Sequence, residues 1–153
     1  MTDPTALRLA PPRVETLPDQ WVQGLDISLE DGAGAIPGLW VRAMERIGRE
    51  VRDRPDLAYG LCHGRAPMRY LAGMVLPERI AGLDRVLLPA GRYAIWEHRG
   101  PVGEIHRTFA AIRDHGLEEA GLTAREAPEF ERYGQDFDAA SGEGPVEIGI
   151  AVA

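Results

Sequence analysis

The sequence predicts an α+β fold in which two strand-helix-strand-strand units, related by a pseudo-twofold axis, form one antiparallel sheet. We expect two main helices on one face of that sheet and a groove between the halves. A length of 153 residues suits one domain, and both halves show the same order of strand and helix patterns. A short repeat accompanies them: Arg13-Val14 and Leu17-Pro18 return as Arg85-Val86 and Leu88-Pro89, the Leu-Pro pair 71 residues later.

The first half begins after a proline-interrupted segment, residues 1–10, which we expect to be a flexible N-terminus. A single domain should then span 11–153, with halves at about 11–78 and 83–153. Apolar alternation predicts a strand over 13–17 and a second strand over 20–29 as its partner. The Gly-rich stretch that follows is typical of a turn.

Helical periodicity starts at Ile36, where apolar residues begin to recur at three- and four-residue steps as far as Val51. Pro37 suits the first turn of this amphipathic helix, and Pro55 marks its exit. Two short strands should follow over 58–63 and 68–76, separated by a turn that suits a hairpin.

The second half repeats this order. Strands are predicted over 85–88 and 92–99, and Gly100-Pro101 should open a helix whose apolar stripe ends before Gly116, which is well placed to close it. Two last strands fit 126–133 and 146–152, joined by an acidic, Gly-rich stretch.

The composition excludes several classes of function. Lys+Arg 17 against Asp+Glu 24 gives a formal charge of −7, which disfavours direct nucleic-acid binding and would attract cations. The single cysteine, Cys62, can form no intramolecular disulfide, the histidines lack metal-ligand spacing, and no phosphate loop or nucleophile elbow is present. We therefore expect no metal and no cofactor. No long apolar segment or signal peptide occurs, so we expect no membrane association and a cytoplasmic location.

Five short segments resemble the GyrI-like, or bacterial transcription activator effector-binding, domains, in the order and spacing of that family. They cover nearly the whole chain, and the longest is Leu88 to Pro101, LPAGRYAIWEHRGP. The others are Tyr59-Gly60-Leu61-Cys62, Tyr70-Leu71-Ala72-Gly73, Phe130-Glu131-Arg132-Tyr133 and Val146-Glu147-Ile148-Gly149-Ile150. The resemblance implies a small-molecule-binding domain made of two tandem units, in agreement with the repeat.

Glu131 is the first candidate for ligand contact, because it matches the acidic residue that meets cationic ligands in this family. Aromatic rings beside a carboxylate can attract a delocalised cation. The alternative is an edge-strand glutamate that faces water or pairs with Arg132 or Arg92. Further candidates for the ligand site are Trp40, Tyr70, Trp96 and Tyr133 as flat walls, Trp21 as an opposite wall, and His98, which shares a strand face with Trp96. For the aromatic residues the alternative is core packing, and for His98 a structural role.

Three functions remain open. The first is a stand-alone binder of a small hydrophobic or cationic molecule. The second is a hydrolase of strained, cyclopropanoid electrophiles, with Glu131 as base and Tyr70 or Tyr133 as proton donor; Met74 and Val75 stand where many family members have an acidic residue, which weakens this reading. The third is a protein-interaction module like the gyrase inhibitor of the family. No helix-turn-helix pattern precedes Arg13, so we do not expect a complete transcription activator.

Overall fold

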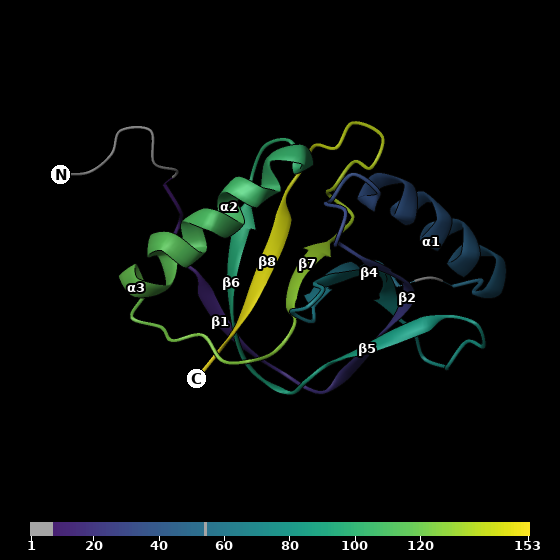
Figure 1. Ribbon diagram of the computed structural model, residues 1–153, viewed down its shortest axis with the longest axis horizontal. Helices are drawn as coiled ribbons and strands as arrows, with labels where there is room; N and C mark the ends of the chain where they lie inside the picture. The colour runs from purple at the N-terminus through teal and green to yellow at the C-terminus, as the bar shows by residue number, and fades with distance from the viewer. Residues whose placement is uncertain (1–7, 54) are drawn as a thin grey trace.

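The computed structural model describes residues 8–53 and 55–153, and it contains one antiparallel sheet with helices on one face (Figure 1). The strand order across the eight-stranded sheet is β1-β6-β8-β7-β3-β4-β2-β5. The strands are β1 (Arg13–Leu17), β2 (Gln20–Ser28), β3 (Ala58–His63), β4 (Arg69–Val75), β5 (Asp84–Leu88), β6 (Gly91–His98), β7 (Glu129–Tyr133) and β8 (Val146–Val152). No helix in this part of the chain is long and apolar enough to cross a membrane.

The strand order confirms the predicted α+β fold with two related halves. When it is followed outward from the central β7-β3 pair, each strand on one side has a counterpart at the same distance on the other: β7 with β3, β8 with β4, β6 with β2, and β1 with β5. The axis of pseudo-symmetry therefore passes between β3 and β7. The seam of the two halves is a pair of hydrogen-bonded strands at the centre of the sheet.

The predicted pairing of 13–17 with 20–29 is wrong. Strand β1 pairs with β6 of the second half, and β5 pairs with β2 of the first, so the halves exchange their edge strands. Each connection has two residues and starts with proline, at Pro18 and Pro89. The favoured two-residue hairpin turns, types I′ and II′, have a positive φ at their first position, and proline cannot adopt it. The chain therefore crosses over at both repeats of Leu-Pro.

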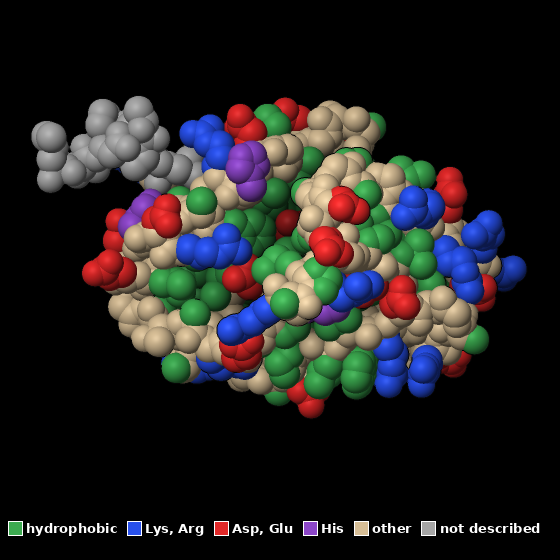
Figure 2. Space-filling model, in the orientation of Figure 1, with side chains coloured by type: hydrophobic (Ala, Val, Ile, Leu, Met, Phe, Trp, Pro, Cys, Tyr) green, Lys and Arg blue, Asp and Glu red, His purple; other side chains and the backbone are tan. Residues whose placement is uncertain are grey.

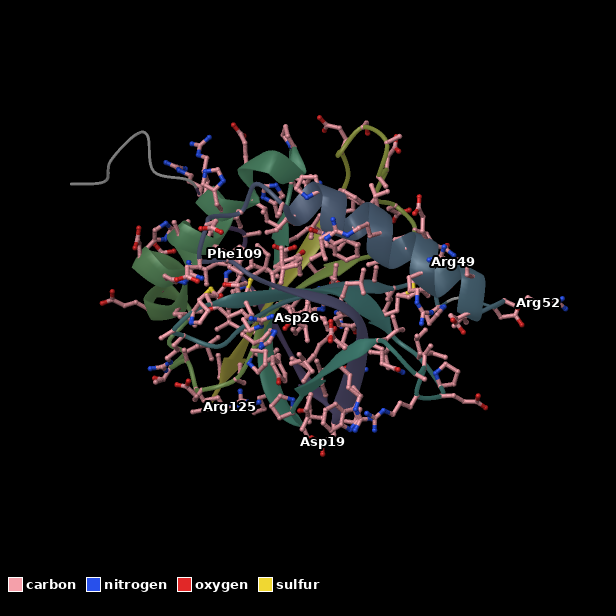
Figure 3. The ribbon with its side chains drawn as sticks, turned by 45° about the vertical axis from the view of Figure 1, so that its right-hand side comes forward. Asp19, Asp26, Arg49, Arg52, Phe109 and Arg125 are labelled. Carbon is pink, nitrogen blue, oxygen red and sulfur yellow. The ribbon has the colours of Figure 1, made fainter. Side chains whose placement is uncertain are left out.

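The two crossovers lie side by side. The carboxylate of Asp19 accepts a hydrogen bond from the Ala90 N–H at 2.6 Å, and the Tyr93 hydroxyl donates to the Pro89 carbonyl at 2.6 Å. In Figure 3 Asp19 and Arg125 mark this end of the molecule, opposite the helices. The sequence repeat thus marks the two points at which the chain passes between halves.

Helix α1 (Ile36–Glu50) follows the predicted pattern. Leu39, Ala43 and Ile47 are buried against the first half of the sheet, and Pro37 lies in the first turn. The helix ends five residues before Pro55, where the Val51 N–H still donates to the Ile47 carbonyl.

The second helical segment is longer than predicted. It runs through η1 (Val102–Glu104), α2 (Ile105–Ala111), the π-turn η2 (Ile112–Gly116) and α3 (Leu117–Glu119), so Gly116 does not end it. The end comes at Gly121, which has φ +67°, with the Leu122 N–H bonded to the Leu117 carbonyl and the Gly121 N–H to the Glu118 carbonyl. This is the Schellman arrangement. A Cβ on Gly116 would lie 2.8 Å from Leu9, so Gly116 instead allows the N-terminal segment to approach.

The sheet is curled and has a core on each face. Away from the helices it encloses a cluster drawn from seven strands, which includes Val22, Leu61, Tyr93 and Phe130. On the other face α1 covers Tyr70, Ala72 and Met74, while α2 and η2 cover Ala94, Trp96 and Ile148. The last hairpin differs slightly from prediction: β7 starts at Glu129 and not at Glu126, directly after Pro128, which has no N–H for the ladder.

Candidate functional site

The seam between the halves lies between the two helices, on the helix-covered face of the sheet. Register places Glu131 of β7 beside Gly60 of β3 and beside Ile148 of β8. Figure 2 shows a hollow between the helices at this position, with hydrophobic side chains around it and an acidic side chain at its base. The seam therefore carries a carboxylate, that of Glu131, on the helix-covered face of the sheet.

Glu131 is buried, with 7% of its surface exposed. Its Oε1 atom accepts two hydrogen bonds, one from the Tyr70 hydroxyl and one from the Tyr133 hydroxyl, each at 2.7 Å. The indole N–H of Trp40 donates to the Tyr70 oxygen at 3.0 Å. Strands β4 and β7 and helix α1 thus bring together four of the residues that the sequence singled out.

The second carboxylate oxygen of Glu131 has a different environment. In the described part of the chain Oε2 accepts no hydrogen bond, yet it is not among the fully buried polar atoms that lack a partner. The small exposed area of Glu131 therefore includes Oε2. Oε2 thus keeps a small exposed area and no hydrogen-bond donor among the described residues, while Oε1 is held by the tyrosines.

The rings around this carboxylate pack edge to face. The centroids of Trp40 and Tyr133 are 5.3 Å apart at an interplanar angle of 73°, and those of Tyr133 and Phe137 are 4.8 Å apart at 63°. Trp40, Tyr133 and Phe137 are all partly exposed, so they are not closed into the core. Phe137 was not a predicted site residue, because nothing in the acidic loop pattern around it indicates that the loop returns over Tyr133.

Gly60 makes the cluster sterically possible. A Cβ at this position would lie 2.1 Å from the Tyr70 hydroxyl oxygen and 2.9 Å from Glu131 Oε1. Neither separation is compatible with a real side chain. The glycine of the YGLC segment therefore provides the space in which the tyrosine and the carboxylate meet across the seam.

Burial changes the acidity of the groups in this cluster. It raises the pKa of Glu131, and the hydrogen bonds from Tyr133 and Tyr70 offset part of that rise. Burial and the nearby Glu131 charge raise the pKa of both tyrosines, so their hydroxyls remain donors at neutral pH. Burial also raises the pKa of Cys62 to about 12, so this thiol is a poor nucleophile.

Three predicted site residues lie away from the cluster. Trp21 is 44% exposed on β2, with the guanidinium of Arg85 4.1 Å from its ring centroid. Trp96 is packed in the core beneath α2 and η2. His98 is buried, and both ring nitrogens have protein partners: Nε2 donates to the Pro101 carbonyl at 3.0 Å, and Nδ1 lies 2.6 Å from the Thr108 hydroxyl. In the structure His98 links β6 to the helix that follows it.

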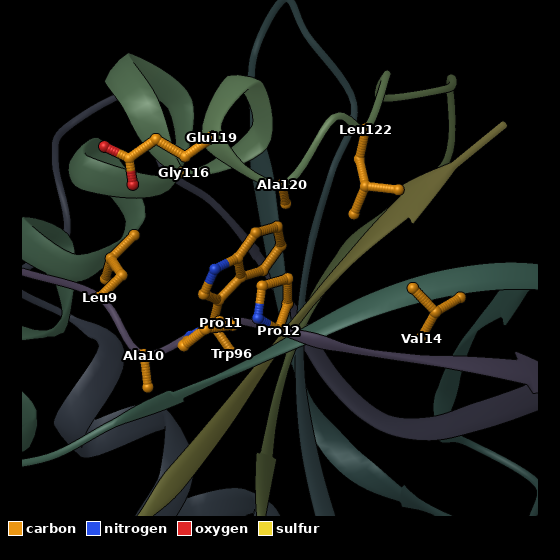
Figure 4. A pocket seen from close by; sticks show the side chains of 10 residues that line it. All are labelled: Leu9, Ala10, Pro11, Pro12, Val14, Trp96, Gly116, Glu119, Ala120 and Leu122. Carbon is orange, nitrogen blue, oxygen red and sulfur yellow. The ribbon is translucent and has the colours of Figure 1, made fainter.

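A second hollow, of about 280 Å³, lies on the far side of Trp96 (Figure 4). It is bounded by the N-terminal segment, β1 and the end of the second helical segment, and its lining is mostly apolar. Among the described residues that line it, only Glu119 is ionisable. Within the described ranges, no three His, Cys, Asp or Glu residues gather as ligands for a metal ion.

Comparison with known families decides the affiliation of the chain. The model of the GyrI-like small molecule binding domain matches residues 10–153. The chain belongs to the GyrI-like family. The predicted resemblance is therefore confirmed, and the chain is a small-molecule-binding domain related to the effector-binding domains of transcription regulators.

Individual relatives agree with this affiliation. The transcriptional regulator BrlR of Pseudomonas aeruginosa is 33% identical over 116 residues, which are 68% of this chain and 43% of BrlR. The chain thus spans less than half the length of that regulator. Among solved structures, SAV2435 bound to tetraphenylphosphonium superposes with a TM-score of 0.70 at 21% identity over 94% of each chain. A hydrolase from Listeria innocua superposes with a TM-score of 0.54 at 13% identity, over 96% of this chain and 94% of that one. The two structures show the shared fold.

Proposed function

We propose that this GyrI-like domain binds a lipophilic, aromatic cation in the seam, with Glu131 as the charge partner of the ligand. The observation that carries the proposal is a buried carboxylate with no arginine or histidine in ion-pair contact, within the described residues, and with tyrosine hydroxyls as its partners. A buried charge without a counter-charge is costly. A ligand that supplies the counter-charge recovers part of that cost.

The walls of the hollow favour a delocalised cation over a compact one. Trp40, Tyr133 and Phe137 present ring edges and faces within one cluster, and cations are attracted to ring faces by about 0.5 to 2 kcal/mol each. A compact ammonium ion would have to give up strong hydration to enter such walls. A phosphonium or quaternary aromatic cation, which spreads its charge over apolar groups, loses little on entry.

Oε2 is the contact point in this proposal. Oε1 already accepts two hydrogen bonds, whereas Oε2 has no hydrogen-bond donor among the described residues and is not fully buried. The ligand centre would stand above Oε2, with Trp40 from α1 and Tyr133 from β7 beside it. SAV2435, which shares this fold, has been solved with tetraphenylphosphonium, and this makes that ion a suitable probe.

Calorimetric titration with two ions of the same shape and opposite charge tests the proposal. Tetraphenylphosphonium should bind, and tetraphenylborate should bind at least about tenfold more weakly, a difference of about 1.4 kcal/mol. The substitution Glu131→Gln, which keeps the shape of the side chain, should remove most of this preference. Equal affinity of the wild-type domain for both ions, or no binding of the phosphonium, would refute the proposal.

A matched control separates the local carboxylate from the overall acidity of the chain. Glu97→Gln removes the same charge from an exposed side chain of β6. Because exposed charges are screened by salt, this variant should bind both ions as the wild type does. If Glu97→Gln weakens phosphonium binding as much as Glu131→Gln, the attraction comes from the net charge of the domain and not from the seam.

The hydrolase alternative has less support from the site. Two-acid chemistry requires a second carboxyl group beside Glu131, and Met74 and Val75 stand here where many family members have an acidic residue. Met74 is buried in an apolar cluster with Ile47, Leu76 and Leu83, beneath α1. A binding role therefore fits the described residues better than acid-base hydrolysis.

A further inference from the structure

The hydrogen bonds around Glu131 leave one carboxylate oxygen, Oε2, free to hold either a proton or a cation. Resting on the ligand site proposed above, we propose that Glu131 exchanges a proton for the ligand: the free domain carries a proton on Oε2, and a docking cation displaces it to solvent. The seam would then be a proton-coupled cation site. Its occupancy would depend on pH as well as on ligand concentration.

The Trp40 indole N–H starts a chain of hydrogen bonds that runs through the Tyr70 hydroxyl to Glu131. The indole N–H of Trp40 can only donate, so the Tyr70 oxygen accepts it and the Tyr70 proton points to Glu131 Oε1. The Tyr133 hydroxyl donates to the same oxygen. Oε1 therefore receives two donors, and a proton on this oxygen would have to displace one of them.

The remaining oxygen, Oε2, can take a proton without the loss of either tyrosine hydrogen bond. Oε2 has no protein donor in the described chain and is not fully buried, so a proton can leave it to solvent. The same oxygen is the one that a ligand cation would approach. Proton and ligand therefore compete for one atom, and both cannot be held there together.

The surroundings favour a protonated carboxyl group in the free domain. Burial raises the pKa of Glu131, and the tyrosine hydrogen bonds only partly oppose this. The other ionisable groups close to it are Tyr70 on β4, Tyr133 on β7 and Cys62 on β3, and the pKa values of all three are raised, which keeps them neutral. Glu129 also lies on β7, and its carboxylate is paired with Arg113 of the π-turn at 2.8 Å. Among the described residues, no neighbour in contact with Glu131 supplies a positive charge.

The exchange balances as one proton for one cation. The protonated carboxyl group loses H⁺ from Oε2, the carboxylate keeps the electron pair, and the cation takes the place of the proton, so the charge of the site does not change. Below the pKa of Glu131 the apparent affinity for a permanent cation should fall about tenfold for each unit of pH. Above it the affinity should be constant.

Calorimetric titration with tetraphenylphosphonium, which has no titratable group, tests the exchange. Measured from pH 5 to pH 8, the affinity should rise with pH and then level off. At the low end of this range, titrations in acetate and in MES, which both buffer there and differ in ionisation enthalpy, should report the release of up to one proton per ligand. Infrared difference spectra should show a carboxylic acid band replaced by a carboxylate band on ligand addition, and Glu131→Gln should lack both bands.

Tyr133→Phe separates this mechanism from a merely structural role of the cluster. Its hydroxyl stabilises the carboxylate, so its loss should raise the pKa of Glu131 further and move the levelling-off point to higher pH. Affinity at the high-pH plateau should change less than affinity at pH 6. A uniform loss of affinity at every pH would overturn the exchange.

The remaining outcomes distinguish this inference from the proposed function. Phosphonium binding with the same affinity across the range and no proton release would overturn the exchange and leave the cation site standing. A pH dependence that persists in Glu131→Gln would assign it to another group and overturn the exchange as well. Absence of binding at every pH would overturn both proposals.

Discussion

At the scale of single residues, the charge of Glu131 works against folding. Its pKa is raised in the folded domain above the ordinary value of 4.5, so ionisation is easier in the unfolded chain. As pH rises through 4.5 and then through the folded value, the unfolded state gives up its proton first and the folded state loses stability relative to it. Functional sites commonly carry such a cost.

Because ionisation of Glu131 destabilises the folded domain, a neutral side chain at this position should stabilise it at high pH. Glu131→Gln replaces the carboxyl group by a neutral amide, so it should raise the free energy of unfolding at pH 8 by about 1 kcal/mol, or roughly 2–4 °C in Tm. The gain should shrink as pH falls and disappear near pH 4, where the wild-type group is neutral in both states. Thermal denaturation of the two proteins across this range measures it. A variant that is less stable than the wild type at pH 8 would contradict the assignment.

Gly60 offers a second test at this scale. A methyl group there would force Tyr70 away from Glu131, so Gly60→Ala should cost about 1–3 kcal/mol, as overpacking in a core does, and should also weaken phosphonium binding. Gly38→Ala is the matched control. Gly38 is exposed in the first turns of α1, and a methyl group there would meet nothing within 4 Å, so alanine should be neutral or stabilise by about 0.5–1 kcal/mol. Urea denaturation of both variants provides the comparison.

The sequence predicted four members of the cluster, Glu131 through the family resemblance and the three aromatic residues through their ring chemistry. Glu131 and Tyr133 are two residues apart on one strand, which places them on one face, and Trp40 and Tyr70 carry the ring chemistry that a cation site needs. Gly60 could not be predicted as a member, because its role is the absence of atoms beside a residue 71 positions away. Trp96 was predicted as a wall of the ligand site, but it packs in the core beneath α2 and η2. Alternation along a strand predicts which face a side chain takes, but not which helix covers that face.

At the scale of elements, the end of the second helical segment depends on Gly121. This residue has φ +67° and terminates the helix through two backbone hydrogen bonds. A side chain in this conformation is strained by about 1 kcal/mol, so Gly121→Ala should lower Tm by roughly 2–4 °C. Gly103→Ala, in an exposed turn with no positive φ and nothing within 4 Å, should have little effect. Equal losses in both variants would argue against the Schellman cap.

The element boundaries explain why sequence patterns located this end wrongly. The apolar stripe of the second helix stops near Gly116, and glycine is a common residue after a helix, so the prediction placed the end there. The structure uses Gly116 for a close approach of Leu9, a contact with a residue more than a hundred positions away. Helix α1 ends where its own apolar stripe ends, at Ile47 and Val51, and its predicted bounds were nearly correct.

At the scale of the whole molecule, the exchanged edge strands bind the two halves into one unit. Each half contributes an outer strand to the sheet of the other, and the core on the face away from the helices contains residues from both. The repeat of Leu17-Pro18 and Leu88-Pro89 predicted two related halves. It did not predict the exchange, because a local pattern gives the positions of strands and not their partners.

This exchange leads to a prediction for fragments of the chain. Residues 1–82 alone would lack β5 and β6, and so would leave one edge of β2 and all of β1 without partners; residues 83–153 would be deficient in the same way. Such edges expose unpaired N–H and C=O groups together with half of a core. We expect each fragment expressed alone to be unfolded or aggregated, and the two fragments expressed together to copurify as a folded complex.

The break between Ala81 and Leu83 suits this test because Ala81 and Gly82 are exposed. Circular dichroism and copurification on a tag carried by one fragment would measure the outcome. The complex should also bind tetraphenylphosphonium, because the seam needs Tyr70 and Trp40 from the first fragment and Glu131 and Tyr133 from the second. A first fragment that folds cooperatively alone would show that the exchanged strands are dispensable. The cation site would still depend on the second half, since no single half contains the whole cluster.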